Sequence, residues 1–99
     1  MRKRLLQLAD LDRLIHEPAR LMIAATLYVV KEADFLYLQR QTELTKGNLS
    51  CHLAKLEEAG YLEIEKTYRG KIPLTLCRLT KKGRTSFQAY EAVLKSALF

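Results

Sequence analysis

Four side chains of this 99-residue chain belong to the types that bind metal ions or act as nucleophiles most often: His16, Cys51, His52 and Cys77. Their spacing does not form a metal site, because no C-x-x-C or H-x-x-x-H pair occurs. The adjacent Cys51 and His52 would diverge by about 100° on a helix. No glycine-rich phosphate loop, nucleophile elbow or histidine–carboxylate pattern can be assembled. We therefore expect no metal, no cofactor and no enzymatic activity, and we interpret both cysteines as reduced thiols.

The basic residues offer a different chemistry, because they gather in one part of the chain. Residues 66–99 carry eight lysines and arginines against a single glutamate, so the last third of the chain holds more than the whole net charge of +6. Such a block predicts a polyanionic partner, most often a nucleic acid. A solvated basic surface that keeps a small protein soluble explains the charge alone equally well.

Hydrophobic spacing predicts the elements that position these residues. The length and an apolar content of 48% predict a single domain over residues 1–99. Apolar residues at helical spacing predict helices over about 4–15, 18–30, 35–42 and 45–59, and a last helix after Thr80. Alternating residues predict strands over 61–68 and 74–79 around a basic turn. In the helix over 35–42, we expect Phe35, Leu36 and Leu38 to face inward.

The start of the chain and its longest apolar run indicate where in the cell the protein is expected. The run Leu21–Val30 is too short to span a bilayer. The basic residues at the start are not followed by the apolar region of a signal peptide. We therefore expect a cytoplasmic protein without a membrane partner.

The expected order, helices followed by a β-hairpin and one more helix, is that of a winged helix-turn-helix. Three stretches also resemble known regulators. Residues 11–21 (LDRLIHEPARL) resemble the corresponding part of ArsR-type regulators, and residues 44–62 (LTKGNLSCHLAKLEEAGYL) resemble the recognition helix of MarR- and ArsR-type regulators. Residues 79–84 (LTKKGR) are similar to the start of the last helix in MarR-type regulators. The resemblance implies a mainly α fold with a β-hairpin and an extra dimerisation helix, in a transcriptional regulator, which we expect to be a repressor, that binds double-stranded DNA as a homodimer.

The helix over 45–59 is the expected recognition helix. Leu49, Leu53 and Leu56 form its buried stripe, and small and polar residues lie on the other side. Lys46 can donate to guanine or to phosphate, and Asn48 can pair with adenine. The residues of this helix that we expect to contact DNA are Thr45, Lys46, Gly47, Asn48, Ser50, Cys51, His52 and Lys55. His52 fits a partly buried, hydrogen-bonded histidine equally well.

The expected wing, about residues 66–74, has a basic tip. Arg69 and Lys71 are expected to contact the DNA backbone or the minor groove, where a narrow groove attracts arginine. Lysine and arginine also protect edge strands from unwanted pairing, and both roles can hold together.

Apolar stripes near both ends of the chain predict a homodimer. The last helix repeats apolar residues at helical spacing, beyond what a domain of this size is expected to cover by itself. A second stripe lies in the first helix, and burial of both stripes about a two-fold axis is the expected mechanism. The interface residues are expected to be Leu5, Leu8, Leu11, Phe87, Tyr90, Val93, Leu94, Ala97 and Leu98.

Two other functions fit parts of the pattern. One is a winged-helix module for protein–protein interaction, which would expose an apolar patch where DNA is otherwise expected. The other is a regulator that also responds to a small molecule or to oxidation, for example of an exposed Cys51. The sequence identifies neither an effector nor an operator.

Overall fold

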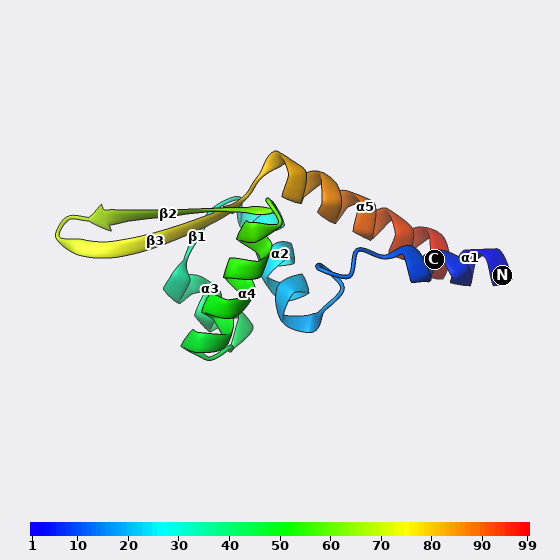
Figure 1. Cartoon of the computed structure of the whole chain (residues 1–99), viewed down its shortest axis with the longest axis horizontal. Coiled ribbons are helices and arrows are strands. Elements are labelled where there is room, and N and C mark those ends of the chain that lie inside the picture. The colour runs from blue at the N-terminus through cyan, green and yellow to red at the C-terminus, as the bar shows by residue number, and fades with distance from the viewer.

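The computed structural model describes all residues 1–99 and shows an elongated molecule with extents of 56 × 25 × 22 Å. Along the chain lie α1 (Arg2–Leu6), the 3₁₀-helix η1 (Gln7–Asp10), α2 (Pro18–Val30), β1 (Ala33–Asp34), α3 (Phe35–Thr42), α4 (Lys46–Glu58), β2 (Leu62–Arg69), β3 (Ile72–Leu79) and α5 (Lys81–Leu98). In Figure 1 the hairpin of β2 and β3, the wing, projects from one end, and α1 lies beside the end of α5 at the other. The fold is the predicted winged helix-turn-helix with an additional C-terminal helix.

The central helix is α2, which contacts α3, α4, α5 and β3. Pro18 occupies its first position, where the missing N–H costs nothing. The Glu17 carboxylate caps the helix by accepting hydrogen bonds from the backbone N–H groups of Ala19 and Arg20, at 3.1 and 2.9 Å. Ile23 and Leu27 are completely buried, and the burial of two such side chains stabilises the fold by about 3–6 kcal/mol. The other helices are therefore assembled on α2.

The sheet has three antiparallel strands in the order β1-β3-β2. The wing pairs from Leu62 and Leu79 at its base to Arg69 and Ile72 at its tip. Only two residues form the turn, and the first of them, Gly70, has a φ of +64°. A two-residue hairpin turn with glycine first has this conformation, which residues with a Cβ avoid. The wing is therefore a regular ribbon almost to its tip.

Two apolar clusters hold the helices together. The first lies between α2, α3, α4 and the base of the sheet, and includes Leu49, Leu53 and Leu56. The second joins the N-terminal segment, α2 and α5, and includes Phe87 and Tyr90. Tyr61, which follows α4, packs against both clusters. The two halves of the molecule are thus connected through the turn after α4.

This turn also carries the start of α5. The Thr80 hydroxyl accepts a hydrogen bond from the N–H of Gly83 at 3.0 Å and donates one to the carbonyl of Gly60 at 2.5 Å. A Cβ at Gly83 would lie 2.1 Å from the carbonyl oxygen of Tyr61. Only glycine allows this approach, so α5 is fixed against the end of α4.

The N-terminal segment differs from the prediction of one helix over 4–15. α1 ends at Leu6 and η1 at Asp10. The Asp12 carboxylate then accepts hydrogen bonds from the N–H groups of Leu14 and Ile15, at 2.9 and 3.3 Å. Such local side-chain bonds compete with the helical ones, and the chain turns toward α2 instead of continuing as a helix.

Two smaller predictions were also wrong, and one element was missed. Leu36, expected to face inward, is 62% exposed, because the buried face of α3 consists of Leu38 and Thr42. The basic turn is shorter than expected, since Ile72 and Pro73 belong to β3. The short strand β1 was not predicted. None of the helices combines the length and the hydrophobicity needed to cross a membrane.

Candidate nucleic-acid interface

α4 has one buried and one exposed face. The Thr45 hydroxyl caps it by accepting a hydrogen bond from the N–H of Asn48 at 3.1 Å. Its three core leucines are buried, as predicted. The exposed residues include Lys46, Gly47, Asn48, Ser50, Cys51 and Lys55, whereas His52 is partly buried. The fold therefore brings the predicted contact residues of this helix to the surface, with His52 at its edge.

The tip of the wing combines charge with apolar surface. Arg69 and Lys71 are both exposed. Beside them, Tyr68 and Ile72 are 70% and 68% exposed. The two predicted wing residues are thus free to meet a partner, together with two large side chains that the sequence analysis did not single out.

Arg78, in β3, is occupied by carboxylates. Its guanidinium nitrogens lie 2.7 Å from Glu32, 3.3 Å from Glu63 and 2.7 Å from Glu65. The hydrogen bonds that Arg78 donates to Glu65 and Glu63 raise the pKa of Arg78. Since three negative charges surround one positive charge, this part of the wing does not attract a phosphate.

Other residues of the basic block are also engaged. Lys82 donates to the carbonyl of Ala59 at 2.8 Å, the Arg84 guanidinium lies 4.8 Å from the centre of the Tyr28 ring, and Lys95 pairs with Glu91 at 3.0 Å. In contrast, five cations of α4 and the wing make neither an ion pair nor a hydrogen bond within the chain: Lys46, Lys55, Lys66, Arg69 and Lys71. Apart from Lys81 at the start of α5, which is also exposed, the free positive charge of this region therefore lies on α4 and the wing.

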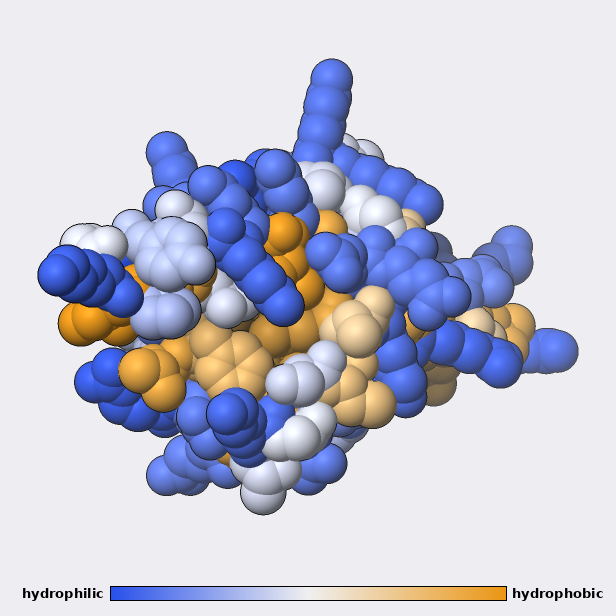
Figure 2. Space-filling view, turned by 60° about the vertical axis from the view of Figure 1, so that its left-hand side comes forward, coloured by the Kyte–Doolittle hydropathy of each residue, from blue (hydrophilic) through white to orange (hydrophobic).

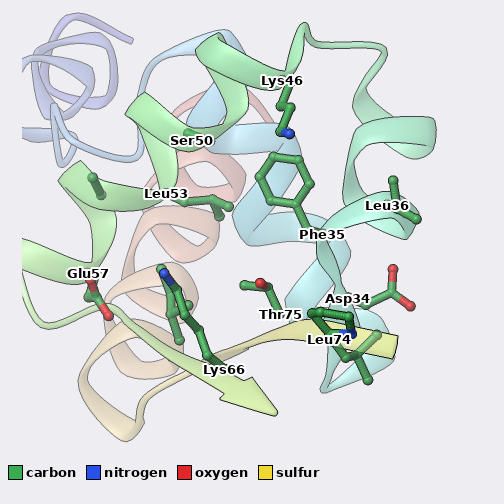
Figure 3. Close-up of a pocket in the computed structure, with 13 residues that line it drawn as sticks. Asp34, Phe35, Leu36, Lys46, Ser50, Leu53, Glu57, Lys66, Leu74 and Thr75 are labelled. Carbon is green, nitrogen blue, oxygen red and sulfur yellow. The ribbon is translucent and has the colours of Figure 1, made fainter. Parts of the chain in front are cut away.

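A cavity of about 750 Å³ lies in the corner between α3, α4 and the wing, and is open to solvent. In Figure 3 the ammonium groups of Lys46 and Lys66 approach this corner cavity from two sides. The carboxylate of Asp34 is turned outward, where it accepts the N–H of Tyr37 at 2.7 Å. The carboxylate of Glu57 also lines the cavity, so the two unpaired ammonium groups share this hollow with a negative charge.

Lys66 was not among the predicted contact residues. The period of two in β2 contains the missing signal, because it places Lys66 on the same side of the strand as Ile64. Ile64 packs against the first apolar cluster, below α4. A residue two positions farther along the strand must therefore face the same corner.

Apolar side chains also reach the surface near this corner. Figure 2 shows an apolar area framed by hydrophilic side chains on the side from which the wing comes forward. Phe35, Leu53 and Leu74 line the cavity, and Leu36 is exposed at its border. The interface is thus an apolar hollow with charged residues of both signs at its rim: Lys46, Lys66, Asp34 and Glu57.

The predicted dimer residues fall into two groups. Leu11, Phe87, Tyr90 and Ala97 are buried within the single chain. The N-terminal segment covers them by folding back on α5, and His16 Nδ1 lies 2.8 Å from the hydroxyl of Tyr90. The other five are partly buried or exposed: Leu5, Leu8, Val93, Leu94 and Leu98. The apolar surface left for a partner is therefore narrower than the sequence suggested, and it lies on α1 and the end of α5.

The cysteines and histidines are not brought together into a site. No three His, Cys, Asp or Glu side chains lie close enough to hold a metal ion. Cys51 is exposed on α4, and Cys77 is completely buried beneath the sheet. Burial raises the pKa of the Cys77 thiol to about 11. Cys77 is therefore an uncharged core residue at neutral pH.

Comparison with known proteins gives one matching family. The sequence model of the winged helix DNA-binding domain matches residues 19–98. An uncharacterized protein of Methanocaldococcus jannaschii is 38% identical over 79 residues, which cover 79% of this chain and 85% of that protein.

Solved structures show the same architecture. A transcriptional regulator homologue from Pyrococcus horikoshii OT3 has a TM-score of 0.87 and 26% identity over 93% of each chain. A MarR family regulator from Enterococcus faecalis V583 has a TM-score of 0.75 and 19% identity, over 84% of this chain and 74% of its own. An ArsR family regulator also has this fold. At the identities of the last two, the likeness concerns the fold alone.

Proposed function

Because this chain belongs to the winged helix DNA-binding domain family, we propose that it is a sequence-specific transcriptional repressor that binds DNA as a homodimer. The family and the fold are those of transcriptional regulators and not of enzymes. The observation that carries the specific proposal is the distribution of charge. Five cations of α4 and the wing are free, whereas Arg78 of the wing and Lys82, Arg84 and Lys95 of α5 are held by groups of the chain itself.

α4 enters the major groove with its N-terminal half. Lys46 and Asn48 read base edges there, and Thr45, Ser50, Lys55 and the other exposed residues of this helix lie near the backbone. A Cβ at Gly47 would meet no atom within 4 Å. Gly47 and Cys51 leave room for the helix backbone to approach the bases closely.

The wing binds beside α4. Arg69 and Lys71 contact the backbone or the minor groove from the tip. Lys66, together with Lys46, contacts the phosphates that separate the two grooves, since both ammonium groups face the corner cavity between helix and wing. Such a protein acts in the cytoplasm, where a bacterial or archaeal cell keeps its DNA.

The test is a pair of fluorescence anisotropy titrations at several salt concentrations. One duplex comes from the region upstream of the chain's own gene, and the other is its scrambled version. We expect tighter binding to the upstream duplex, and a fall of log affinity with log salt of about −0.9 per phosphate contacted. With five free cations, this amounts to about −4 to −5 per bound chain. Equal affinity for both duplexes would exclude sequence-specific recognition.

A protein–protein interaction module is the second candidate, because large apolar side chains are exposed at the corner cavity and at the tip of the wing. Leu36, Tyr68 and Ile72 are 62%, 70% and 68% exposed, and such surface marks interaction sites for proteins. A salt response that is nearly flat, together with weak binding to both duplexes, would favour this candidate. Repression itself is tested by transcription in vitro, which should fall when the chain is added to a template with the upstream region.

A further inference from the structure

The ring of His52 lies against two charged residues from the start of α2. Its Nδ1 is 3.1 Å from a guanidinium nitrogen of Arg20 and 3.6 Å from a carboxylate oxygen of Glu17. The side chains of His52, Arg20 and Glu17 are 20%, 12% and 29% exposed, respectively. The contact joins the N-terminal end of the central helix to the middle of α4.

The two charged residues are themselves fixed. Arg20 Nε donates to the carbonyl of Leu14 at 2.6 Å, so the guanidinium cannot swing away without losing this bond. The Glu17 carboxylate accepts the N–H groups of Ala19 and Arg20. Burial raises the pKa of Glu17, but these backbone hydrogen bonds and the nearby charge of Arg20 outweigh it and lower the pKa overall. Both partners therefore present a defined geometry to the ring.

This geometry selects one tautomer of His52. A guanidinium group only donates hydrogen bonds, so the nitrogen that faces Arg20 must accept. Nδ1 is then unprotonated, and in the neutral ring the proton resides on Nε2. Glu17 would favour the opposite tautomer, but at 3.6 Å it lies beyond hydrogen-bond distance.

The remaining ring nitrogen, Nε2, has no hydrogen-bond partner within the chain. Asn48 lies four residues before His52 and Lys55 three residues after it, so all three share one side of α4. Since Asn48 and Lys55 belong to the proposed DNA-binding surface, the free N–H of His52 is available to the same partner.

We propose that Arg20, supported by Glu17, is a positioning residue that holds the proton of His52 on Nε2, so that this N–H donates a hydrogen bond to a DNA phosphate. Only the second part of the inference, the hydrogen bond to a phosphate, rests on the proposed DNA binding. The tautomer belongs to the free protein and can be measured without DNA.

The first experiment records two-bond ¹H–¹⁵N correlation spectra of the free chain at neutral pH, which identify the protonated ring nitrogen. The chain has two histidines, so a His16→Gln variant assigns both signals. We expect His52 to carry its proton on Nε2, and to lose this preference in Arg20→Met. A proton on Nδ1 in the wild type, or an unchanged spectrum in Arg20→Met, would overturn the positioning role.

The second experiment compares His52→Gln with His52→Asn on a mixed-sequence duplex of about 30 base pairs, long enough for two half-sites one helical turn apart. Glutamine keeps an N–H donor near the position of Nε2, whereas asparagine offers polar atoms only near Nδ1. We expect His52→Asn to bind about tenfold more weakly and His52→Gln to stay within about threefold of the wild type, because a hydrogen bond to a charged group is stronger than one between neutral groups. Equal losses in the two variants would exclude the donor role.

A double-mutant cycle separates positioning from general stability. Arg20→Met should weaken binding in the wild-type background but add little to His52→Asn, because both remove the same contact. Additive losses would show that Arg20 acts independently of His52. If Arg20→Met does not fold, the wild-type spectrum still tests whether the proton of His52 is on Nε2, and the two His52 variants still test whether this N–H donates to DNA. If the wild type binds no duplex, the proposed function fails, while the tautomer still tests Arg20.

Discussion

At the scale of single residues, Asn48 offers the sharpest test of base reading. Its backbone N–H is bonded to Thr45, and its side chain is exposed and without a partner in the first turn of α4. Asn48→Ala should cost about 1–3 kcal/mol on the upstream duplex and little on the scrambled one, because a base-edge contact discriminates between sequences. Anisotropy titrations on both duplexes measure the difference. Equal losses on both would mean that Asn48 contacts only the backbone.

Cys77 links the core to pH. Its pKa is about 11 in the folded chain because of burial, against an ordinary value of 9.0. Below pH 9 the thiol is protonated in both the folded and the unfolded chain, and its contribution to the free energy of unfolding is complete. Between about pH 9 and 11 the unfolded chain releases the proton first, so the stability falls, by about 2–3 kcal/mol for two pKa units.

Urea unfolding at several pH values measures this loss. Cys77→Ala is the control: it should be less stable at pH 7 because of the cavity, but should lack the additional loss between pH 9 and 11. Two tyrosines with raised pKa values, the partly buried Tyr61 and the buried Tyr90, titrate in both proteins and cancel in the comparison. Parallel curves for the two proteins would contradict the assignment to Cys77.

At the scale of elements, the sequence predicted what depends on local spacing. The stripe of Leu49, Leu53 and Leu56 defined α4, and the alternation over 61–68 defined a strand of the wing; the fold class and the resemblance to winged-helix regulators are confirmed. β1 was missed because two residues become a strand only through pairing with Cys77 and Leu76. Its formation depends on a partner more than 40 positions away in the chain.

The same reason explains what was missed in the candidate site. In the sequence, Arg78 is one cation of a basic block. Glu32, which pairs with it, lies 46 positions earlier in the chain, directly after α2. Lys66 appeared as part of the strand, and its role became visible only once α4 was packed above it. Local periodicity predicts which face of a helix or strand is buried, whereas the tertiary fold decides which charged residues form ion pairs.

The wing allows a prediction that separates free from paired cations. Lys71→Gln and Lys66→Gln should each weaken binding to any duplex and make the salt slope shallower by about 0.9, because each removes one phosphate contact. Arg78→Gln also removes one positive charge, but its guanidinium is occupied by three glutamates. Because Arg78 contacts no phosphate, Arg78→Gln should leave the salt slope unchanged. Equal salt slopes for all three variants would contradict the division into free cations, Lys66 and Lys71, and a paired cation, Arg78.

The junction of α4 and α5 depends on Gly83. In Gly83→Ala the new Cβ would lie 2.1 Å from the carbonyl oxygen of Tyr61, so the helix must shift. We expect a loss of about 3 kcal/mol in the free energy of unfolding, at the upper end for overpacking. Gly47→Ala is the matched control, because its Cβ meets nothing within 4 Å and alanine favours a helix by up to about 1 kcal/mol. Urea unfolding should give opposite signs for the two variants; similar losses would contradict the close approach.

At the scale of the whole molecule, the two ends have different surfaces. The wing with its free cations projects at one end of a chain that is 56 Å long, and α1 lies beside the end of α5 at the other (Figure 1). A two-fold axis at the end formed by α1 and α5 would place the two wings far apart, on opposite sides of the dimer. Such a dimer presents two copies of α4 to a palindromic site, which a monomer cannot do.

The residues left exposed at this end define the test of the dimer. Phe87 and Tyr90 are unsuitable, because they belong to the core of the single chain and their replacement would unfold it. Leu98 is 53% exposed at the end of α5, and Leu5 of α1 is 50% exposed. A glutamate at position 98 would leave the core of the chain intact, and would place a charge in the proposed interface, where its desolvation is unfavourable.

We therefore expect light scattering at low micromolar concentration to give a mass near twice 11.4 kDa for the wild type, and near 11.4 kDa for Leu98→Glu. Leu36→Glu is the matched control: Leu36 is 62% exposed, but it lies on α3, away from α1 and α5. It should remain dimeric. Since one recognition helix makes only half of the contacts, Leu98→Glu should also bind the upstream duplex far more weakly than the wild type does. A wild-type mass of a single chain would refute the dimer, and a Leu98→Glu variant that stays dimeric would place the interface elsewhere.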